Sequence, residues 1–152
     1  MKFLILLLFF LVLLINCTNT HPTNENQSVF SLSVEAAELY KIVGEKHDTA
    51  MLLMKEIGLG TSRLRIKLNN LEENNPQKDT ILNLLLLLKK ADDGMMNWMR
   101  EFKNTDLNED MYKAMKQEEI MNYLRQEEIK IEKVHLDMLK SIKDASSFLN
   151  MH

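Results

Sequence analysis

The sequence predicts an all-α protein, an antiparallel bundle of three long helices, or of four if the first or the last helix breaks. From Ser33 onward apolar side chains recur at alternating spacings of three and four residues, which places them on one face of a helix. The whole chain contains only 4 Gly and 2 Pro, too few turn-forming residues for a sandwich or barrel of many short strands. The segments that connect the periodic stretches are short, so neighbouring helices must run antiparallel.

The first 16 residues are typical of a secretory signal peptide. A short basic start, Met1-Lys2, precedes a run of 13 apolar side chains from Phe3 to Ile15. A basic start, an apolar core and a processing site follow in the order that export signals show. This run is too short for a helix that crosses a bilayer, which needs about 20 residues. We therefore expect residues 1–16 to direct export of the remaining chain.

The single cysteine of the chain, Cys17, follows the apolar run directly. The residues Leu14-Ile15-Asn16-Cys17 resemble the lipobox of bacterial lipoproteins, although Asn16 replaces the small residue usual before the cysteine. The resemblance implies cleavage before Cys17 and its acylation, for example with palmitate, which anchors a protein to a membrane. An ordinary secretory signal with an incidental cysteine is the alternative.

Cleavage before the cysteine leaves 152 − 16 = 136 residues, and loss of Lys2 changes the formal charge from −3 to 18 − 22 = −4. Residues 17–32 are polar and show no apolar period, which is typical of a flexible tether between a membrane and a folded domain.

The helical domain is expected to span residues 33–152 and to begin with a helix that Ser33 caps. Glu35 lies in its first turn, where the helix dipole favours an acid. The expected core positions of this first helix are Tyr40, Val43, His47, Ala50, Met54, Ile57, Thr61, Leu64, Leu68 and Leu71. Its weakest part surrounds Gly58 and Gly60, because each glycine costs about 1 kcal/mol relative to alanine. We expect a kink or a break there.

Asn74-Asn75-Pro76 separates the first helix from the second, because proline disfavours helix at the preceding residue and suits the first helical position. The second helix is expected from about Pro76 to Lys103. Its core positions are Leu84, Leu88, Ala91, Met95, Trp98 and Phe102. The third helix is expected from about Leu107 to Asn150, with Glu127 as an acidic residue on its core face. Its apolar core positions are Ile120, Leu124, Ile131, Val134, Met138, Ile142, Ala145 and Leu149.

The expected helices differ in length. At 1.5 Å per residue the second helix spans about 42 Å, whereas an unbroken first or third helix spans about 60 Å. The apolar faces near residues 34–46 and 135–150 should then extend beyond the second helix. A second copy of the chain, an envelope protein partner, or a bend near Gly58-Gly60 or Glu127 could cover them. The sequence leaves these alternatives and the oligomeric state open.

Methionines gather at one end of the expected bundle. If the turn between the first and second helices centres near residue 75, residues of these helices face each other when their numbers sum to about 149. For the second and third helices, whose turn centres near residue 105, the sum is about 210. His47 then lies opposite Phe102. Met51 lies opposite Trp98. The same end collects His47, Met51, Met54, Met95, Met96, Trp98, Met99, Phe102, Met111 and Met115.

Two interpretations of this cluster are open. Methionine fills irregular gaps in a core and contacts aromatic rings favourably, and His47 is then a core histidine bonded to Asp48, Tyr112 or a carbonyl. The alternative is a site for a soft metal ion, Cu(I), because thioether sulfur and imidazole nitrogen select soft ions. His47 and Met51 form an i, i+4 pair on one helix face, and the Trp98 ring could cover the ion. The proposed ligands are His47, Met51, Met54, Met95 and Met99, and the proposed surrounding residues are Met96, Trp98, Phe102, Met111 and Met115.

The sequence offers no arrangement typical of an enzyme, and we expect no catalytic activity and no cofactor, unless copper binds the cluster. The pairing places His47 and His135 far apart, so a dinuclear metal site is not supported. Gly-rich phosphate loops and a nucleophile-elbow serine are absent. A formal charge of −3 lacks the basic surface that nucleic-acid binding needs.

Three segments carry a resemblance to known proteins. They begin at Tyr40 (YKIVGEKHDTAMLLMKEIG), at Ala91 (ADDGMMNWMREFK) and at Tyr123 (YL, with IEKV from Ile131 and MLKSIKDA from Met138). They resemble small uncharacterised lipoproteins of Bacteroidota-type bacteria, some of which carry the automatic name "viral A-type inclusion protein", over most of residues 34–149. The resemblance implies an envelope lipoprotein of unknown role. We therefore expect an exported protein, anchored by lipid to a membrane of the bacterial cell envelope, whose helical domain serves a structural or interaction role.

Overall fold

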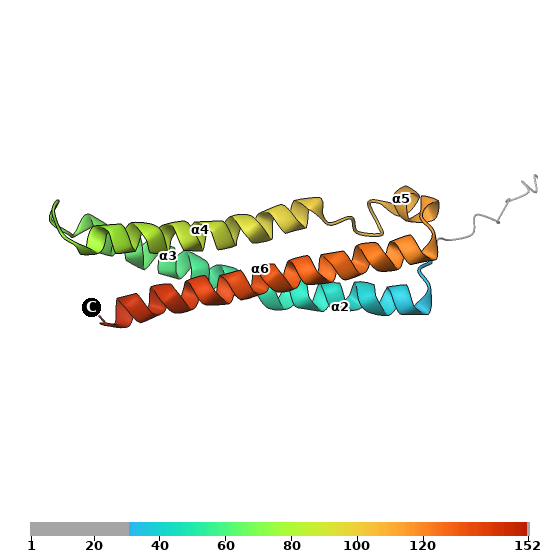
Figure 1. Cartoon of the computed structure of the whole chain (residues 1–152), viewed down its shortest axis with the longest axis horizontal. Coiled ribbons are helices and arrows are strands. Elements are labelled where there is room, and N and C mark those ends of the chain that lie inside the picture. Colours follow the sequence, from blue (N-terminus) through green and yellow to red (C-terminus); the bar gives the residue numbers. More distant parts are fainter. Residues whose placement is uncertain (1–30, 152) are drawn as a thin grey trace, which may run out of the picture.

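The computed structural model describes residues 31–151, and within this range every regular element is a helix. The helices are α2 (Val34–Met51), α3 (Met54–Asn69), α4 (Gln77–Glu101), α5 (Glu109–Ala114) and α6 (Gln117–Met151). The long helices pack side by side, which confirms the predicted all-α bundle (Figure 1). The predicted signal peptide 1–16, Cys17 and the predicted tether as far as residue 30 lie outside the described residues.

The bundle has three columns, one of which consists of two consecutive helices (Figure 1). α2 and α3 follow each other in the same direction, α4 returns antiparallel to them, and α6 runs antiparallel to α4 and parallel to α2 and α3. α6 contacts α2, α3 and α4, while α3 also contacts α4. At the surface Lys46 of α2 joins α6 through Glu128 and Glu132, with N–O distances of 3.2 and 2.9 Å.

The apolar ends of the long helices are covered within one chain, so neither a second copy of the chain nor a folded-back fourth helix is needed to bury them. Ala36, near the start of α2, is buried in a cluster with Tyr112 of α5. Phe148, near the end of α6, belongs to the main core. The reason is the parallel course of α6 beside the α2–α3 column, since residues 34–69 and the 35-residue α6 have nearly the same length. The expectation paired only helices that are consecutive in the chain, so it did not include the contact of α6 with α2 and α3.

The first helix does break, but at Leu52 and Leu53 rather than at Gly58 and Gly60. Both leucines keep right-handed helical backbone angles, with φ −61° and ψ −26° at Leu52, so no fourth helix folds back on the first. The Leu53 N–H donates to the Ala50 carbonyl over 3.0 Å, which makes a tight turn between α2 and α3.

The starts of α2 and α4 follow the sequence signals. The Ser33 hydroxyl accepts a hydrogen bond from the Ala36 N–H at 3.2 Å, which confirms the predicted cap of α2. At the start of α4 the Asn75 side-chain oxygen accepts from the Gln77 N–H at 2.9 Å. Both bonds satisfy backbone donors that have no partner within the first helical turn.

The third helix begins at Gln117, ten residues later than expected. The short α5 and extended backbone at Met115, with a ψ of 145°, precede it. Burial of Tyr112 accounts for this interruption, because it holds α5 against the end of the bundle rather than along the axis of α6. From Gln117 onward α6 continues without a break through Glu127, where a bend was one of the alternatives.

The buried side chains form two clusters along the bundle. The main cluster contains Val43, Ala50, Ile57, Leu64, Ile81, Leu84, Leu88, Ala91, Met95, Trp98, Ile131, Met138, Ala145 and Phe148. The second cluster, at the α5 end, contains Ala36, Tyr112, Ile120 and Leu124. Most of these residues are expected core positions, while burial of Ala36, Ile81, Tyr112, Ser141 and Phe148 was not expected.

Gly58 and Gly60 lie two residues apart in α3 but have different surroundings. A Cβ added at Gly58 meets no atom within 4 Å, whereas one at Gly60 lies 3.4 Å from Leu88 Cδ1 and 3.9 Å from the Ala145 Cβ. α3 stays helical through both glycines because its core face is buried, and packing rather than propensity stabilises it.

Replacement by leucine should therefore change the free energy of unfolding in opposite directions at these two positions. We predict that Gly58→Leu raises the free energy of unfolding by about 1 kcal/mol through helix propensity. Gly60→Leu should lower it by about 1–3 kcal/mol, because the larger side chain overpacks against α4 and α6. Thermal unfolding followed by circular dichroism measures both effects. Equal shifts for the two variants would contradict the close packing at Gly60.

Candidate functional site

A pocket of about 310 Å³ lies between α2 and α4, where the histidine and methionine cluster is expected. We call it the aromatic pocket. It is lined by Tyr40, Gly44, His47, Trp98, Met99 and Phe102. A Cβ added at Gly44 meets no atom within 4 Å, so the missing side chain leaves open space on the α2 side of the pocket.

Aromatic rings and the His47 imidazole stack in a row along this pocket. The ring centroids of His47 and Trp98 are 5.3 Å apart, and those of Trp98 and Phe102 are 4.8 Å apart. Phe102 continues the row to Tyr40 at 5.7 Å and to Tyr123 of α6 at 6.4 Å. Each such pair stabilises the fold by about 0.5–1.5 kcal/mol beyond the contribution from burial of the rings. The row therefore connects α2, α4 and α6.

His47 stacks on Trp98, whereas the pairing of residue numbers placed it opposite Phe102. The turn between α3 and α4 occupies residues 70–76 and centres near residue 73 rather than 75, which shifts the facing residue by about one helical turn. The Nδ1 atom of His47 lies 3.0 Å from the Asp48 carboxylate. This bond agrees with the interpretation of His47 as a structural histidine, and it leaves Nε2 without a hydrogen-bond partner among residues 31–151.

The structure distributes the expected methionine cluster over several surroundings. Met99 lines the aromatic pocket with His47, Trp98 and Phe102. The other methionines lie elsewhere: Met95 in the main core, Met54 in a groove between α3 and α4, Met51 and Met96 at the surface, and Met111 and Met115 against the second cluster. Of the five proposed metal ligands, His47 and Met99 alone share the aromatic pocket. No group of three or more His, Cys, Asp or Glu side chains within residues 31–151 could hold a metal ion.

Tyrosine hydroxyls hold the segment that follows α4, a feature that the sequence analysis missed. The Lys103 N–H donates to the Tyr123 hydroxyl at 2.7 Å, and the Tyr112 hydroxyl donates to the Lys103 carbonyl at 2.7 Å. The Thr105 N–H donates to the Tyr40 hydroxyl at 3.3 Å. Apolar periodicity finds tyrosine rings but says nothing about where their hydroxyls bond.

Glu127 is an acid within the core, only 2% exposed. One of its oxygens accepts from the Lys130 amine at 2.7 Å, and the other is buried without a hydrogen-bond partner among the described residues. The Trp98 indole N–H is buried without a partner in the same part of the chain. Phe102 at the end of α4 stacks on Tyr123 of α6, and the two helices are antiparallel. Trp98 lies one turn before Phe102 and Glu127 lies one turn after Tyr123, so Trp98 and Glu127 are at the same level of the bundle. Two buried polar atoms without a partner among the described residues therefore lie at one level of the core.

Alkaline pH should destabilise the fold through two of these tyrosines. Burial raises the pKa of Tyr123 to about 12 and raises the pKa of Tyr112 further, and the negative charge of Glu127 adds to both shifts. The folded state therefore holds these protons more tightly than the unfolded state, whose tyrosine pKa is 10.0. This contribution to the free energy of unfolding is complete below pH 10 and decreases as the pH rises through 10 toward 12.

Chemical unfolding at a series of pH values measures this dependence. Tyr123→Phe should make the free energy of unfolding fall less steeply above pH 10, because one of the two shifted groups is removed. An unchanged slope in that variant would contradict the shifted pKa of Tyr123.

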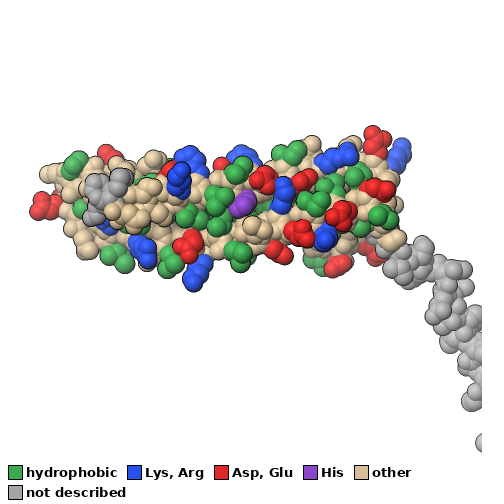
Figure 2. Space-filling view, turned by 90° about the horizontal axis from the view of Figure 1, so that it is seen from below, with side chains coloured by type: hydrophobic (Ala, Val, Ile, Leu, Met, Phe, Trp, Pro, Cys, Tyr) green, Lys and Arg blue, Asp and Glu red, His purple; other side chains and the backbone are tan. Residues whose placement is uncertain are grey.

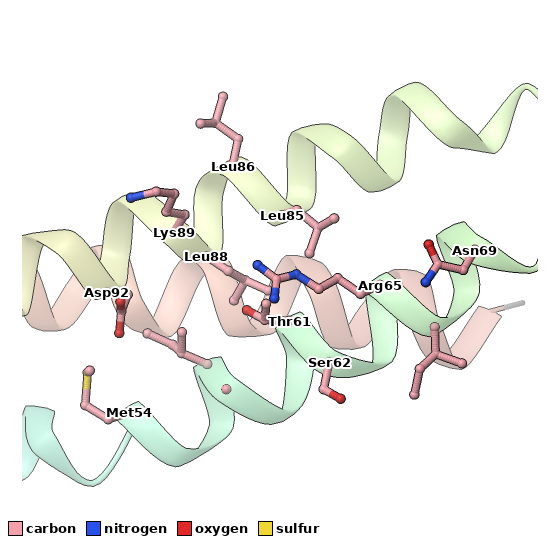
Figure 3. A pocket seen from close by; sticks show the side chains of 13 residues that line it. Met54, Thr61, Ser62, Arg65, Asn69, Leu85, Leu86, Leu88, Lys89 and Asp92 are labelled. Carbon is pink, nitrogen blue, oxygen red and sulfur yellow. The ribbon is translucent and has the colours of Figure 1, made fainter.

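A larger groove of about 770 Å³ lies between α3 and α4 (Figure 3). Leu85 and Leu88 line it from α4. Arg65 extends into the space between the helices, and Asp92 points toward α3 (Figure 3). Neither charged side chain has an ion-pair partner among residues 31–151. The groove thus combines an apolar wall with one free charge of each sign.

Three large apolar side chains are exposed at seven-residue intervals along α3 and the turn before it. Leu52, Leu59 and Ile66 are 77%, 41% and 60% exposed. Seven residues are close to two helical turns, so the three side chains form one line, which we call the α3 row. On the face shown in Figure 2, hydrophobic side chains lie in patches between charged ones. Regular apolar spacing of this kind is typical of a surface that packs against another helix.

No protein-family model, no curated protein and no solved structure matches this chain. No helix within residues 31–151 is long and apolar enough to cross a membrane.

Proposed function

We propose that this protein is a lipid-anchored protein of the bacterial cell envelope whose helical domain binds a protein partner, in a structural or interaction role. The apolar run from Phe3 to Ile15 and Cys17 after it support the anchor. The α3 row is the observation that carries the interaction role. The bundle buries its main core without these three side chains. Packing within one chain therefore does not account for their regular spacing on the surface.

Photo-crosslinking in cells that make the full chain tests the interaction role. Benzoylphenylalanine at Leu59 should give a crosslinked product on illumination, because Leu59 lies in the middle of the α3 row. The same amino acid at Lys90, an exposed position of α4, is the matched control and should give none. Absence of product from Leu59 and also from Ile66 would exclude the interaction role. Circular dichroism of the purified variants confirms that each is folded.

A soft-metal site is the second candidate function, and one observation favours it. His47 and Met99 line the same pocket. The Asp48 carboxylate accepts from Nδ1 of His47, which directs the lone pair of Nε2 away from Asp48, as in metal-binding histidines. Imidazole and thioether together select Cu(I). The ligand set in this proposal is narrower than the five residues first expected.

Cu(I) titration of the purified protein tests this second candidate. His47→Ala and Met99→Leu should each remove stoichiometric binding without changing the helix content. Bound Cu(I) should also quench the fluorescence of Trp98, the only tryptophan, whose ring centroid is 5.3 Å from that of His47. Met96→Leu is the matched control, since Met96 is exposed and lies outside the pocket. Wild-type protein that binds no Cu(I) excludes this candidate.

A further inference from the structure

We infer that the partner of the α3 row is a second copy of this chain, bound antiparallel about a two-fold axis at Leu59. This inference rests on the proposed interaction role and names its partner. The row is symmetric, because Leu52 precedes Leu59 by seven residues and Ile66 follows it by seven. In an antiparallel pair with Leu59 at the axis, Leu52 of each copy faces Ile66 of the other. Such self-complementarity is what a two-fold interface requires.

The charges beside the row complement each other in the same arrangement. At about 100° per residue, Glu56 and Arg63 lie on one side of the row, and Lys55 and Ser62 lie on the other. The two-fold axis brings like sides together, so Glu56 faces Arg63 of the other copy and Lys55 faces its Ser62. Glu56 and Arg63 are exposed and have no hydrogen-bond or ion-pair partner among residues 31–151. In the antiparallel pair the Glu56 of each copy faces the Arg63 of the other, so two ion pairs form.

A parallel arrangement of the same row fits less well. It brings opposite sides of the row together, so Glu56 faces Lys55 of the other copy and Arg63 faces its Ser62. The antiparallel pair joins Glu56 to Arg63 instead, and the Arg63 guanidinium can bind a carboxylate through two parallel hydrogen bonds, which the Lys55 amine cannot do. On the Lys55 side of the row, Gly58 and Ser62 are small and a Cβ added at Gly58 meets nothing, so a second helix can approach closely there. A lipid anchor at Cys17 would hold copies on one membrane and raise their local concentration, which favours a small interface of this kind.

Cysteine crosslinking tests both the partner and its orientation, in membranes of cells that make the full chain. A short bismaleimide should join Leu59→Cys chains into a product of twice the chain mass, because residue 59 faces itself across the axis. Leu52→Cys alone and Ile66→Cys alone should give none, since 14 residues along a helix separate each position from its own copy by about 21 Å. Cells that make both of these variants should give the product. The wild-type chain, whose only cysteine is Cys17, measures the background.

Charge reversal provides a second readout in chains that carry Leu59→Cys. Glu56→Arg and Arg63→Glu should each lower the crosslinked yield about tenfold, because each replaces two ion pairs by two like-charge contacts. The double variant should restore the yield, which a merely structural effect of either change would not do.

The outcomes separate this inference from the interaction role. A product of twice the chain mass from Leu59→Cys, with none from Leu52→Cys alone, supports the antiparallel pair. Product from Leu52→Cys alone, or none of this mass from Leu59→Cys, overturns it. If Leu59 photo-crosslinks to a different protein and no such product forms, the second copy is excluded and the interaction role stands. If neither method gives a crosslink, both proposals fail.

Discussion

Tyr112→Ala is expected to lower the free energy of unfolding by about 3–5 kcal/mol. Tyr112 is the largest of the fully buried side chains, and it holds the six-residue α5 in the second cluster. Its hydroxyl also donates to the Lys103 carbonyl at 2.7 Å, so truncation opens a cavity and releases the segment after α4. Because small domains are stable by about 5–15 kcal/mol in total, this single change removes a large share of the stability.

Tyr112→Phe separates the two contributions. It keeps the buried ring and loses the hydroxyl, so the expected loss is about 1 kcal/mol. Urea unfolding followed by circular dichroism and by the fluorescence of Trp98 measures both variants. Met111→Ala is the matched control on α5, because Met111 is only partly buried. If Tyr112→Ala costs no more than Tyr112→Phe, burial of the ring does not hold α5 in place.

Cys17→Ser is expected to abolish attachment of the protein to membranes. Serine lacks the thiol that accepts the lipid in the proposed processing. Each buried methylene of an acyl chain contributes about 0.8 kcal/mol, and two or more chains together make a stable anchor. Palmitate labelling and membrane fractionation should therefore find label and protein in the membrane fraction for the wild type and neither for Cys17→Ser.

Asn16→Gly is the matched control for this experiment, because it introduces the small residue usual before a lipobox cysteine. It should be labelled at least as well as the wild type. Absence of label from the wild type would favour the ordinary secretory signal with an incidental cysteine. Membrane retention of Cys17→Ser would mean that the anchor lies elsewhere.

The buried faces of the helices could be predicted closely. Leu84, Leu88 and Trp98 in the second helix and Leu124 in the third are buried as expected, because apolar periodicity records which face of a helix avoids water. The spacing also predicted Glu127 as an acid on the core face, and Glu127 is buried.

The candidate sites were predicted less well. A shift of two residues in the centre of the first turn places His47 on Trp98 rather than opposite Phe102, and most methionines lie outside the pocket that holds His47. The α3 row was not predicted, although Leu52, Leu59 and Ile66 are spaced seven residues apart in the sequence. The row is a second apolar period, on the outer face of the first helix, in addition to the period of the core face.

Local sequence patterns specify the helical class, the cap at Ser33 and the core face of each helix. These properties depend on residues within one or two helical turns of each other, which local spacing encodes. Packing between helices, in contrast, keeps α3 helical past Gly60, and burial of Tyr112 holds α5 apart from α6. Packing between helices also places α6 parallel to the α2–α3 column. Each of these outcomes depends on contacts between residues far apart in the chain, whose energies no local pattern records.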